Sequence, residues 1–283
     1  MELGTMFELD WLSDLGILRE AAQAFDDAGL DYVTFGGHLL TARAERYPDR
    51  HLSTYALPFR DPFVLFANLA AVTRRLRFRT GVLILPMFPT VLVAKQAADL
   101  SLLSDGRFQL GIGLSWQEAE YRAMGSEFRH RGVRMTEQLE VLRRLWTEPI
   151  VTFSGRYHQL DEVGLGQLPA EPIPIWVGCG SEQHLLERVG RWADGWMPLT
   201  SLRSPEEASL LRRVAEASGR SEPIGVASRL SSRSDVDVMV AKARSQQAAG
   251  ATALTIGVAP GTAPSAGIKA VIAAKETLAS ALA

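Results

Sequence analysis

The chain has 283 residues, of which 47% are hydrophobic and 22% are charged, as in a soluble globular protein with a sizeable core. Its net charge of −2 excludes a strongly basic nucleic-acid or membrane-surface binder, and no apolar run reaches the roughly 20 residues of a membrane helix. The single cysteine, Cys179, excludes an internal disulfide bond, and the N-terminus lacks a signal-peptide pattern, so we expect a cytoplasmic protein.

Patterns typical of strands and of amphipathic helices alternate along the whole chain. The predicted strands are, in chain order, residues 3–9, 32–35, 76–85, 107–112, 173–177, 195–197, 224–227 and 253–258. The predicted helices are residues 11–28, 62–73, 90–103, 116–124, 132–146, 182–193, 205–217, 235–249 and 264–282. Residues 150–160 are expected to form a short excursion between a helix and the fifth strand.

This alternation predicts a parallel sheet with helical crossovers. About eight strand–helix pairs favour a closed (β/α)8 TIM barrel over an open doubly wound sheet, which would carry G-x-G-x-x-G after its first strand. There is no linker and no internal repeat, so we expect one domain over residues 1–283. Active sites of such barrels lie at the carboxyl ends of the strands.

Several motifs in the middle of the chain resemble those of the bacterial-luciferase-like monooxygenase and oxidoreductase family. They are TGVLILP at 80–86, LSDGRF at 103–108, LGIG at 110–113 with Trp116, RG at 131–132 with Glu137, Leu142 and LW at 145–146, and IWVG at 175–178 with ADGW at 193–196. Each motif alone is weakly specific, and their order and spacing carry the resemblance. It implies a barrel that binds a reduced flavin or deazaflavin at its carboxyl-terminal mouth.

The details resemble most the branch of this family that uses the deazaflavin coenzyme F420, and the branch that uses FMN is the alternative. The resemblance implies a non-prolyl cis peptide between Gly81 and Val82, which lies against the cofactor ring. Deazaflavin enzymes of this family commonly carry an Asp-His pair after the second strand, in contact with the ring or in proton transfer. His38 has this position, but Gly37 stands where the aspartate would be.

Two glycine-rich segments at strand ends are further candidates for cofactor contacts. Gly111 and Gly113 at the end of the fourth strand would let the ring approach the backbone, or form an ordinary strand exit. Trp116 after them either lines the substrate pocket or caps the barrel.

The run Gly178, Cys179, Gly180 and Ser181 follows the fifth strand and opens a helix. Its N–H groups favour the cofactor's phosphate or ribityl tail, and the alternative is a normal turn with Ser181 as the N-cap. Cys179 is expected to be a small filler and not a nucleophile.

The other titratable residues give no sharper candidates. No metal site is expected, because the remaining histidines lack ligand spacing: His51, His130, His158 and His184. No carboxylate pair stands out, although Asp10, Glu118 and Glu120 lie near predicted strand ends.

Together these features predict an F420-dependent oxidoreductase that transfers a hydride between the deazaflavin and an unidentified small organic substrate. One alternative is an FMN-dependent monooxygenase that uses FMNH2 and oxygen, with a separate enzyme that reduces the flavin. Another is a barrel that binds a ligand without catalysis, which the missing aspartate before His38 leaves open. The resemblance also implies a homodimer. The long polar loop of residues 39–59 is the expected lid or substrate segment.

Overall fold

The computed structural model describes residues 1–41, 58–199, 205–217, 219–220, 222–231 and 235–282. Eight of its strands are parallel, and their bounds are β1 (Glu2–Met6), β2 (Tyr32–Phe35), β3 (Arg77–Thr80), β4 (Phe108–Ile112), β7 (Ile175–Cys179), β8 (Gly195–Pro198), β9 (Gly225–Ser231) and β10 (Ala253–Gly257). They close into a barrel in the order β1-β10-β9-β8-β7-β4-β3-β2. The predicted (β/α)8 barrel is therefore confirmed.

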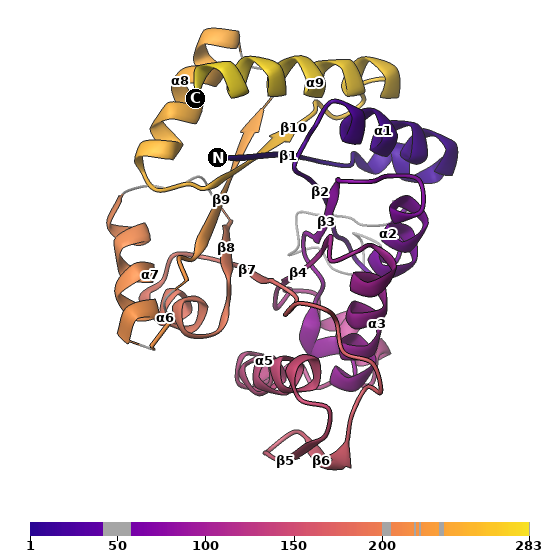
Figure 1. The fold of residues 1–283 in the computed structure, drawn as a ribbon, viewed down its shortest axis with the longest axis vertical. Coiled ribbons are helices and arrows are strands. Elements are labelled where there is room, and N and C mark those ends of the chain that lie inside the picture. Colours follow the sequence, from indigo (N-terminus) through magenta and orange to yellow (C-terminus); the bar gives the residue numbers. More distant parts are fainter. Residues whose placement is uncertain (42–57, 200–204, 218, 221, 232–234, 283) are drawn as a thin grey trace.

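Helices surround this barrel, and one hairpin extends away from it (Figure 1). The helices are α1 (Leu15–Asp27), α2 (Pro62–Ala70), α3 (Thr90–Leu103), α4 (Glu118–Ala123), α5 (Arg131–Thr147), α6 (Gln183–Trp192), α7 (Pro205–Ala217), α8 (Val236–Ala248) and α9 (Pro264–Ala281). The hairpin consists of β5 (Val151–Ser154) and β6 (Gln159–Val163), which pair antiparallel. It corresponds to the excursion predicted for residues 150–160.

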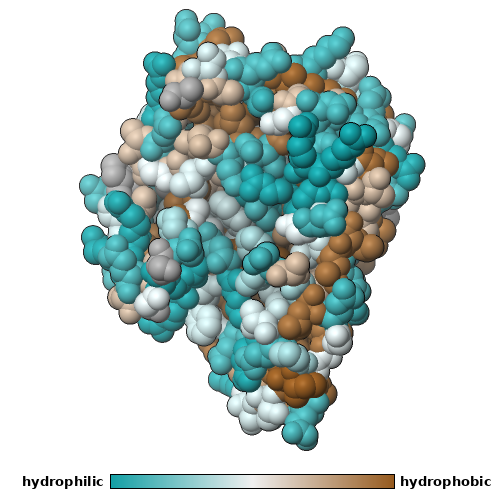
Figure 2. Space-filling view, in the orientation of Figure 1, coloured by the Kyte–Doolittle hydropathy of each residue, from teal (hydrophilic) through white to brown (hydrophobic). Residues whose placement is uncertain are grey.

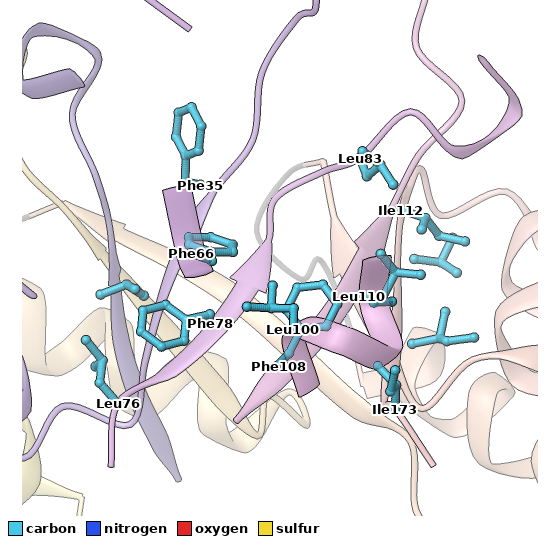
Figure 3. Close-up of a cluster of buried hydrophobic side chains, with 14 of the residues drawn as sticks. Phe35, Phe66, Leu76, Phe78, Leu83, Leu100, Phe108, Leu110, Ile112 and Ile173 are labelled. Atoms are coloured by element: carbon cyan, nitrogen blue, oxygen red, sulfur yellow. The ribbon is translucent and has the colours of Figure 1, made fainter. Parts of the chain in front are cut away.

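The side chains of the barrel strands alternate between two environments, because successive strand residues point to opposite faces of a sheet. On β3, Phe78 points outward into the main core, where its ring centroid lies 5.3 Å from that of Phe66 on α2. Figure 3 shows this layer, in which Leu110 of β4 and Leu100 of α3 also lie. Arg79, the next residue on β3, points to the interior instead and stacks on Trp176 of β7.

Several predicted boundaries differ from the structure by a few residues, and two of the differences have a clear physical cause. The strand predicted over residues 76–85 is shorter, since β3 ends at Thr80 and a 3-10 helix, Leu85–Met87, replaces its end. Between them the chain returns to the barrel for one residue, where Leu83 bridges Ile112. The helix predicted over residues 11–28 begins at Leu15, because Asp14 accepts hydrogen bonds from two backbone N–H groups of the first turn and caps it.

The surface gives one further constraint. Within the described ranges, no helix has the length and apolar content needed to span a bilayer. Figure 2 shows a largely hydrophilic face, with apolar side chains gathered on its lower right side, beside α3. Exposed apolar residues of α2 and α3 include Val64, Val91, Leu92 and Leu103.

Candidate functional site

A cavity of about 440 Å³, here called the mouth cavity, opens at the carboxyl ends of the barrel strands. This volume lies within the roughly 300–1,000 Å³ of typical small-molecule sites. Six barrel strands contribute to it, because residues of β1, β2, β3, β4, β7 and β8, or the residues that directly follow them, line the cavity. The lining residues used below are Glu8, His38, Phe59, Val82, Gly113, Trp116 and Gly178.

Val82 forms part of the mouth cavity's wall and is surrounded by glycines of three neighbouring segments. The Gly81–Val82 peptide bond is cis, as the family resemblance implies. A Cβ atom on Gly113 or Gly178 would lie 2.7 or 2.9 Å from a Val82 methyl group, and one on Gly36 would collide with the Val82 backbone nitrogen. These three positions therefore require glycine because Val82 packs against them. Val82, Gly113, Gly178 and Gly36 together form the wall that a ligand in the mouth cavity would contact.

Gly111 lies in the barrel wall and is not among the residues that line the mouth cavity. The Thr80 hydroxyl donates to the Gly111 carbonyl at 2.6 Å and accepts from the Gly111 N–H at 2.7 Å. A Cβ atom at this position would collide with the Thr80 carbonyl oxygen. Glycine is thus required at position 111 because β3 and β4 approach closely there, and not because a ligand does. Gly113, in contrast, does line the mouth cavity.

The run from Gly178 to Ser181 is divided by the structure. Gly178 lines the mouth cavity, but Cys179, Gly180 and Ser181 are not among its lining residues. β7 extends to Cys179, and Glu182, not Ser181, is the N-cap residue of α6. A Cβ atom on Gly180 would collide with the Glu182 carboxylate, so an acidic group already lies at this turn. That charge opposes the binding of a phosphate there.

Cys179 is poorly suited to act as a nucleophile. Burial raises the pKa of its thiol to about 12. Its backbone carbonyl accepts a hydrogen bond from Nε1 of Trp196 at 3.2 Å, which fixes the end of β7. Because the thiolate is the reactive form of cysteine, a thiol with this pKa is inert near neutral pH.

His38 at the rim of the mouth cavity is paired with a buried carboxylate. Its Nδ1 atom lies 2.7 Å from Oε2 of Glu120, whose side chain is 0% exposed. The other oxygen of Glu120 accepts hydrogen bonds from the backbone nitrogens of Leu39 at 2.7 Å and Leu40 at 3.1 Å. A carboxylate only accepts, so Nδ1 of His38 carries the proton in this pair, and Nε2 is the atom that can exchange a proton with a ligand.

The position of Glu120 is set by the short helix α4, which follows the glycine-rich end of β4. The hydroxyl of Tyr121 donates to the carbonyl of Leu114 at 2.7 Å and holds this helix against the strand exit. Burial raises the pKa of Tyr121 to about 12, so the phenol stays a donor. The sequence did not predict a partner for Glu120. The signal that could have indicated it is an acidic residue in the first turn of a helix directly after a glycine-rich strand end.

Gly37, which replaces the aspartate expected before His38, is explained by packing. A Cβ atom on Gly37 would collide with the ring of Phe59. That ring lies edge-on to His38 with a centroid distance of 5.4 Å, and Trp116 lies on His38 in the same manner at 5.7 Å. The aromatic side chains confine the imidazole, and Glu120 supplies the carboxylate that the sequence position lacks.

Glu8, which follows β1, is a second titratable group in the mouth cavity that sequence reasoning missed. Burial raises the pKa of its carboxyl above the ordinary value, and the nearby charge of Asp10 adds to this effect, although a backbone hydrogen bond with Val258 opposes it. A carboxyl group with a raised pKa in a cavity is a candidate for proton exchange with a ligand.

Two expectations concern other groups. The described part of the chain contains no cluster of histidine, cysteine or acidic residues that could hold a metal ion. Of the predicted lid segment, residues 42–57 lie outside the described residues.

Residues 9–277 match the family model described as luciferase-like monooxygenase. An uncharacterized protein of Mycobacterium tuberculosis, Rv0940c, is 40% identical over 173 residues, which cover 60% of this chain and 59% of that protein. Pyrimidine monooxygenase RutA of Allorhizobium ampelinum is 34% identical over 62% of this chain and 47% of its own length. F420-dependent glucose-6-phosphate dehydrogenase of Kineococcus radiotolerans is 31% identical over 73% of this chain and 60% of its own length.

Solved structures support the same fold. The crystal structure of monooxygenase RslO1 from Streptomyces bottropensis superimposes with a TM-score of 0.78 and covers all of both chains at 21% identity. At this identity the similarity concerns the barrel and not the reaction.

Proposed function

Since the chain belongs to the luciferase-like monooxygenase family, we propose that it is an oxidoreductase that uses coenzyme F420 to transfer a hydride to or from a small organic substrate. The observation that carries this proposal is the His38–Glu120 pair at the rim of a cavity walled by Gly81 and Val82. The F420-dependent relative from Kineococcus supports the choice of cofactor.

The mouth cavity fits a flat ring system. Its volume of about 440 Å³ is adequate, and the lining residues around Val82 are glycines that leave backbone as the surface facing a ligand. When bound, the deazaflavin would supply hydride transfer at its central ring. Val82, Gly113 and Gly178 would hold the ring.

The residues of the chain supply orientation and proton transfer. His38 would donate or accept a proton at Nε2 while the carboxylate of Glu120 holds its Nδ1 atom. Phe59 and Trp116 lie edge-on against the imidazole and would limit its contact with water, which would strengthen its interaction with a bound substrate. Glu120 is a positioning residue, since it reaches the cavity only through His38.

The cofactor assignment is tested by titrating the purified protein with F420 and with FMN and following the fluorescence of each. We expect saturable binding of F420 and weaker binding of FMN. A His38→Asn variant should still bind F420, because other residues support the ring. It should turn over more slowly, because it lacks the proton-transferring Nε2 atom. Tighter binding of FMN than of F420 would contradict the proposal.

The second candidate is an FMN-dependent monooxygenase, which the similarity to RutA favours. Oxygen consumption that depends on added FMNH2 would establish it, and a separate flavin-reducing enzyme would then be required. The complete His38–Glu120 pair favours either reaction over a barrel without catalysis. A homodimer remains a proposal that light scattering on the purified protein tests.

A further inference from the structure

A second cavity, of about 150 Å³, lies inside the barrel next to the mouth cavity. The two cavities share four lining residues, namely Gly81, Val82, Gly178 and Leu199. A water molecule requires roughly 10–15 Å³ of such volume, so this inner cavity has room for a small ion together with water. The two cavities are therefore adjacent, and Val82 belongs to the wall of both.

Arg79 places a buried positive charge at the inner cavity. Its side chain is 1% exposed, and its guanidinium lies between the rings of Tyr32 and Trp176, at 4.1 and 3.6 Å from their centroids. The Nε atom donates to Gln109 at 2.7 Å, and Nη2 pairs with Glu2 at 3.2 Å. The Nη1 atom is buried without a hydrogen-bond partner. Buried donors in folded proteins are normally satisfied, so this N–H group favours the binding of an acceptor next to it.

Two further residues with hydrogen-bond donors line the inner cavity, namely Thr34 and Arg229. The hydroxyl of Thr34 on β2 is also buried and unpartnered. Arg229 lines the cavity from the carboxyl end of β9, is exposed to solvent, and forms no ion pair with any described residue. No acidic residue is among those that line the cavity. Its surroundings are therefore cationic, apart from Glu2, which is shared between Arg79 and Arg77.

We propose that the inner cavity is an anion-binding subsite for a small oxyanion, either a carboxylate or a phosphate group. Nη1 of Arg79 and the hydroxyl of Thr34 would bind it from within the barrel, and Arg229 would bind it from the rim. Charge-assisted hydrogen bonds of this kind are the strong ones, and arginine suits oxyanions in particular. The Gly178–Ser181 turn is the weaker place for an anion, because the Glu182 carboxylate lies against it.

The subsite does not depend on the proposed function, which determines only whether the cofactor or the substrate carries the anion. Its test is a calorimetric titration of the purified full-length protein with inorganic phosphate, without any cofactor. We expect Arg229→Gln to weaken phosphate binding by about tenfold, as expected for the loss of one charge-assisted hydrogen bond. Thr34→Val, which keeps the shape of the side chain, should weaken it by a smaller factor.

The matched control is Arg213→Gln, which removes an exposed arginine of α7 that does not line the cavity. Its phosphate affinity should equal that of the wild type. Arg79 itself is not replaced, because its stacking between two rings makes it part of the barrel's packing. The subsite is refuted if phosphate does not bind the wild type, or binds the Arg229→Gln and Thr34→Val variants equally well.

A second titration identifies the source of the anion by comparing F420 with its deazaflavin chromophore, which lacks the phosphate tail. If Arg229→Gln weakens binding of F420 but not of the chromophore, the subsite holds the cofactor's phosphate. If both bind the variant as they bind the wild type, and phosphate binds the cofactor-loaded protein, the subsite serves a substrate anion. Absence of F420 binding with intact phosphate binding would overturn the proposed function alone.

Discussion

Nδ1 of His38 and Oε2 of Glu120 lie 2.7 Å apart, although 82 positions separate the two residues in the sequence. His38 follows β2 and Glu120 belongs to the first turn of α4, so the pair joins two separate segments at the rim of the barrel mouth. The same carboxylate binds the backbone N–H groups of Leu39 and Leu40 and fixes the chain just after the histidine. Its removal would therefore affect both the imidazole and the loop.

Glu120→Gln separates these two roles. The glutamine oxygen can still accept from Leu39 and Leu40, but its amide would donate to Nδ1 of His38 and impose the opposite tautomer. We expect kcat to fall about 10²–10⁴-fold, the range for loss of general acid–base catalysis, with little change in cofactor affinity. Glu118→Gln on the exposed side of the same helix is the control and should keep wild-type kcat. Steady-state kinetics with cofactor titration measure both, and an unchanged kcat for Glu120→Gln would contradict the role of the pair.

Gly36→Ala should disrupt the wall of the mouth cavity. The new Cβ atom would collide with the backbone of Gly81 and Val82, which cannot move without shifting the barrel rim. We expect a loss of roughly 1–3 kcal/mol in the free energy of unfolding, as for other overpacked sites, together with weaker cofactor binding. In Gly257→Ala the new atom would lie 3.4 Å from the Leu230 carbonyl, and this control should bind cofactor normally. Urea denaturation measures the unfolding free energy of both variants, and cofactor titration measures their affinity. A Gly36→Ala variant with the stability and affinity of Gly257→Ala would contradict this prediction.

Asp26 gives a prediction for the pH dependence of stability. Burial alone would raise the pKa of this carboxyl, but hydrogen bonds from the backbone nitrogens of Arg74, Arg75 and Leu76 lower it below the ordinary value. A lowered pKa stabilises the fold above the unfolded pKa of about 3.9, and this contribution is lost as the pH falls from there through the folded pKa. Asp26→Asn should cost about 1–3 kcal/mol at pH 7.

The difference in unfolding free energy between wild type and Asp26→Asn should shrink as the pH falls below about 3.9, because the carboxyl protonates first in the unfolded state and only at lower pH in the folded state. The adjacent exposed residue provides the control, Asp27→Asn, which should change stability little at either pH. Urea denaturation at both pH values measures these differences. A difference for Asp26→Asn that is the same at pH 7 and in acid would show that the ionised carboxylate is not its source.

Cys179 should react slowly with alkylating reagents in the folded protein. Because burial raises its pKa to about 12, the thiolate population at pH 8 is very small. Mass spectrometry after iodoacetamide treatment should show little labelling of native protein and complete labelling in denaturant. Cys179→Ala should retain cofactor affinity and turnover, and its inactivity would instead assign the thiol to the site.

The barrel could be predicted from the sequence because each of its strands and helices has a pattern of its own in the local sequence. Apolar runs such as that of β4 and the periodic faces of helices such as α5 each report their own environment, and their alternation implies the parallel topology. Boundaries that depend on one cap or one turn were less accurate. Asp14 ends a 3-10 segment that has helical periodicity, and the chain leaves the strand path after Thr80 although its residues remain apolar.

The site could be predicted only in part, since its key contacts link distant positions. Val82, Gly113 and Gly178 were recognised from motifs and do meet around the mouth cavity. The pairing of His38 with Glu120 depends on where α4 folds back, and the orphaned nitrogen of Arg79 depends on side-chain packing inside the barrel. Neither has a local sequence signature. The position of Glu182 over Gly180 likewise follows from the conformation of the turn.

Closure of the barrel leaves each of its strands hydrogen-bonded on both sides, so the free strand edges of the described chain belong to the β5–β6 hairpin. Such edges are where a strand of another molecule can add and begin aggregation. On β6 the exposed residues include Asp161 and Glu162, whose charges oppose that addition. On β5 the carbonyl of Thr152 already accepts a hydrogen bond from Arg144 of α5. The acidic side chains of β6 and the occupied carbonyl of β5 therefore disfavour the pairing of this hairpin with a strand of another molecule.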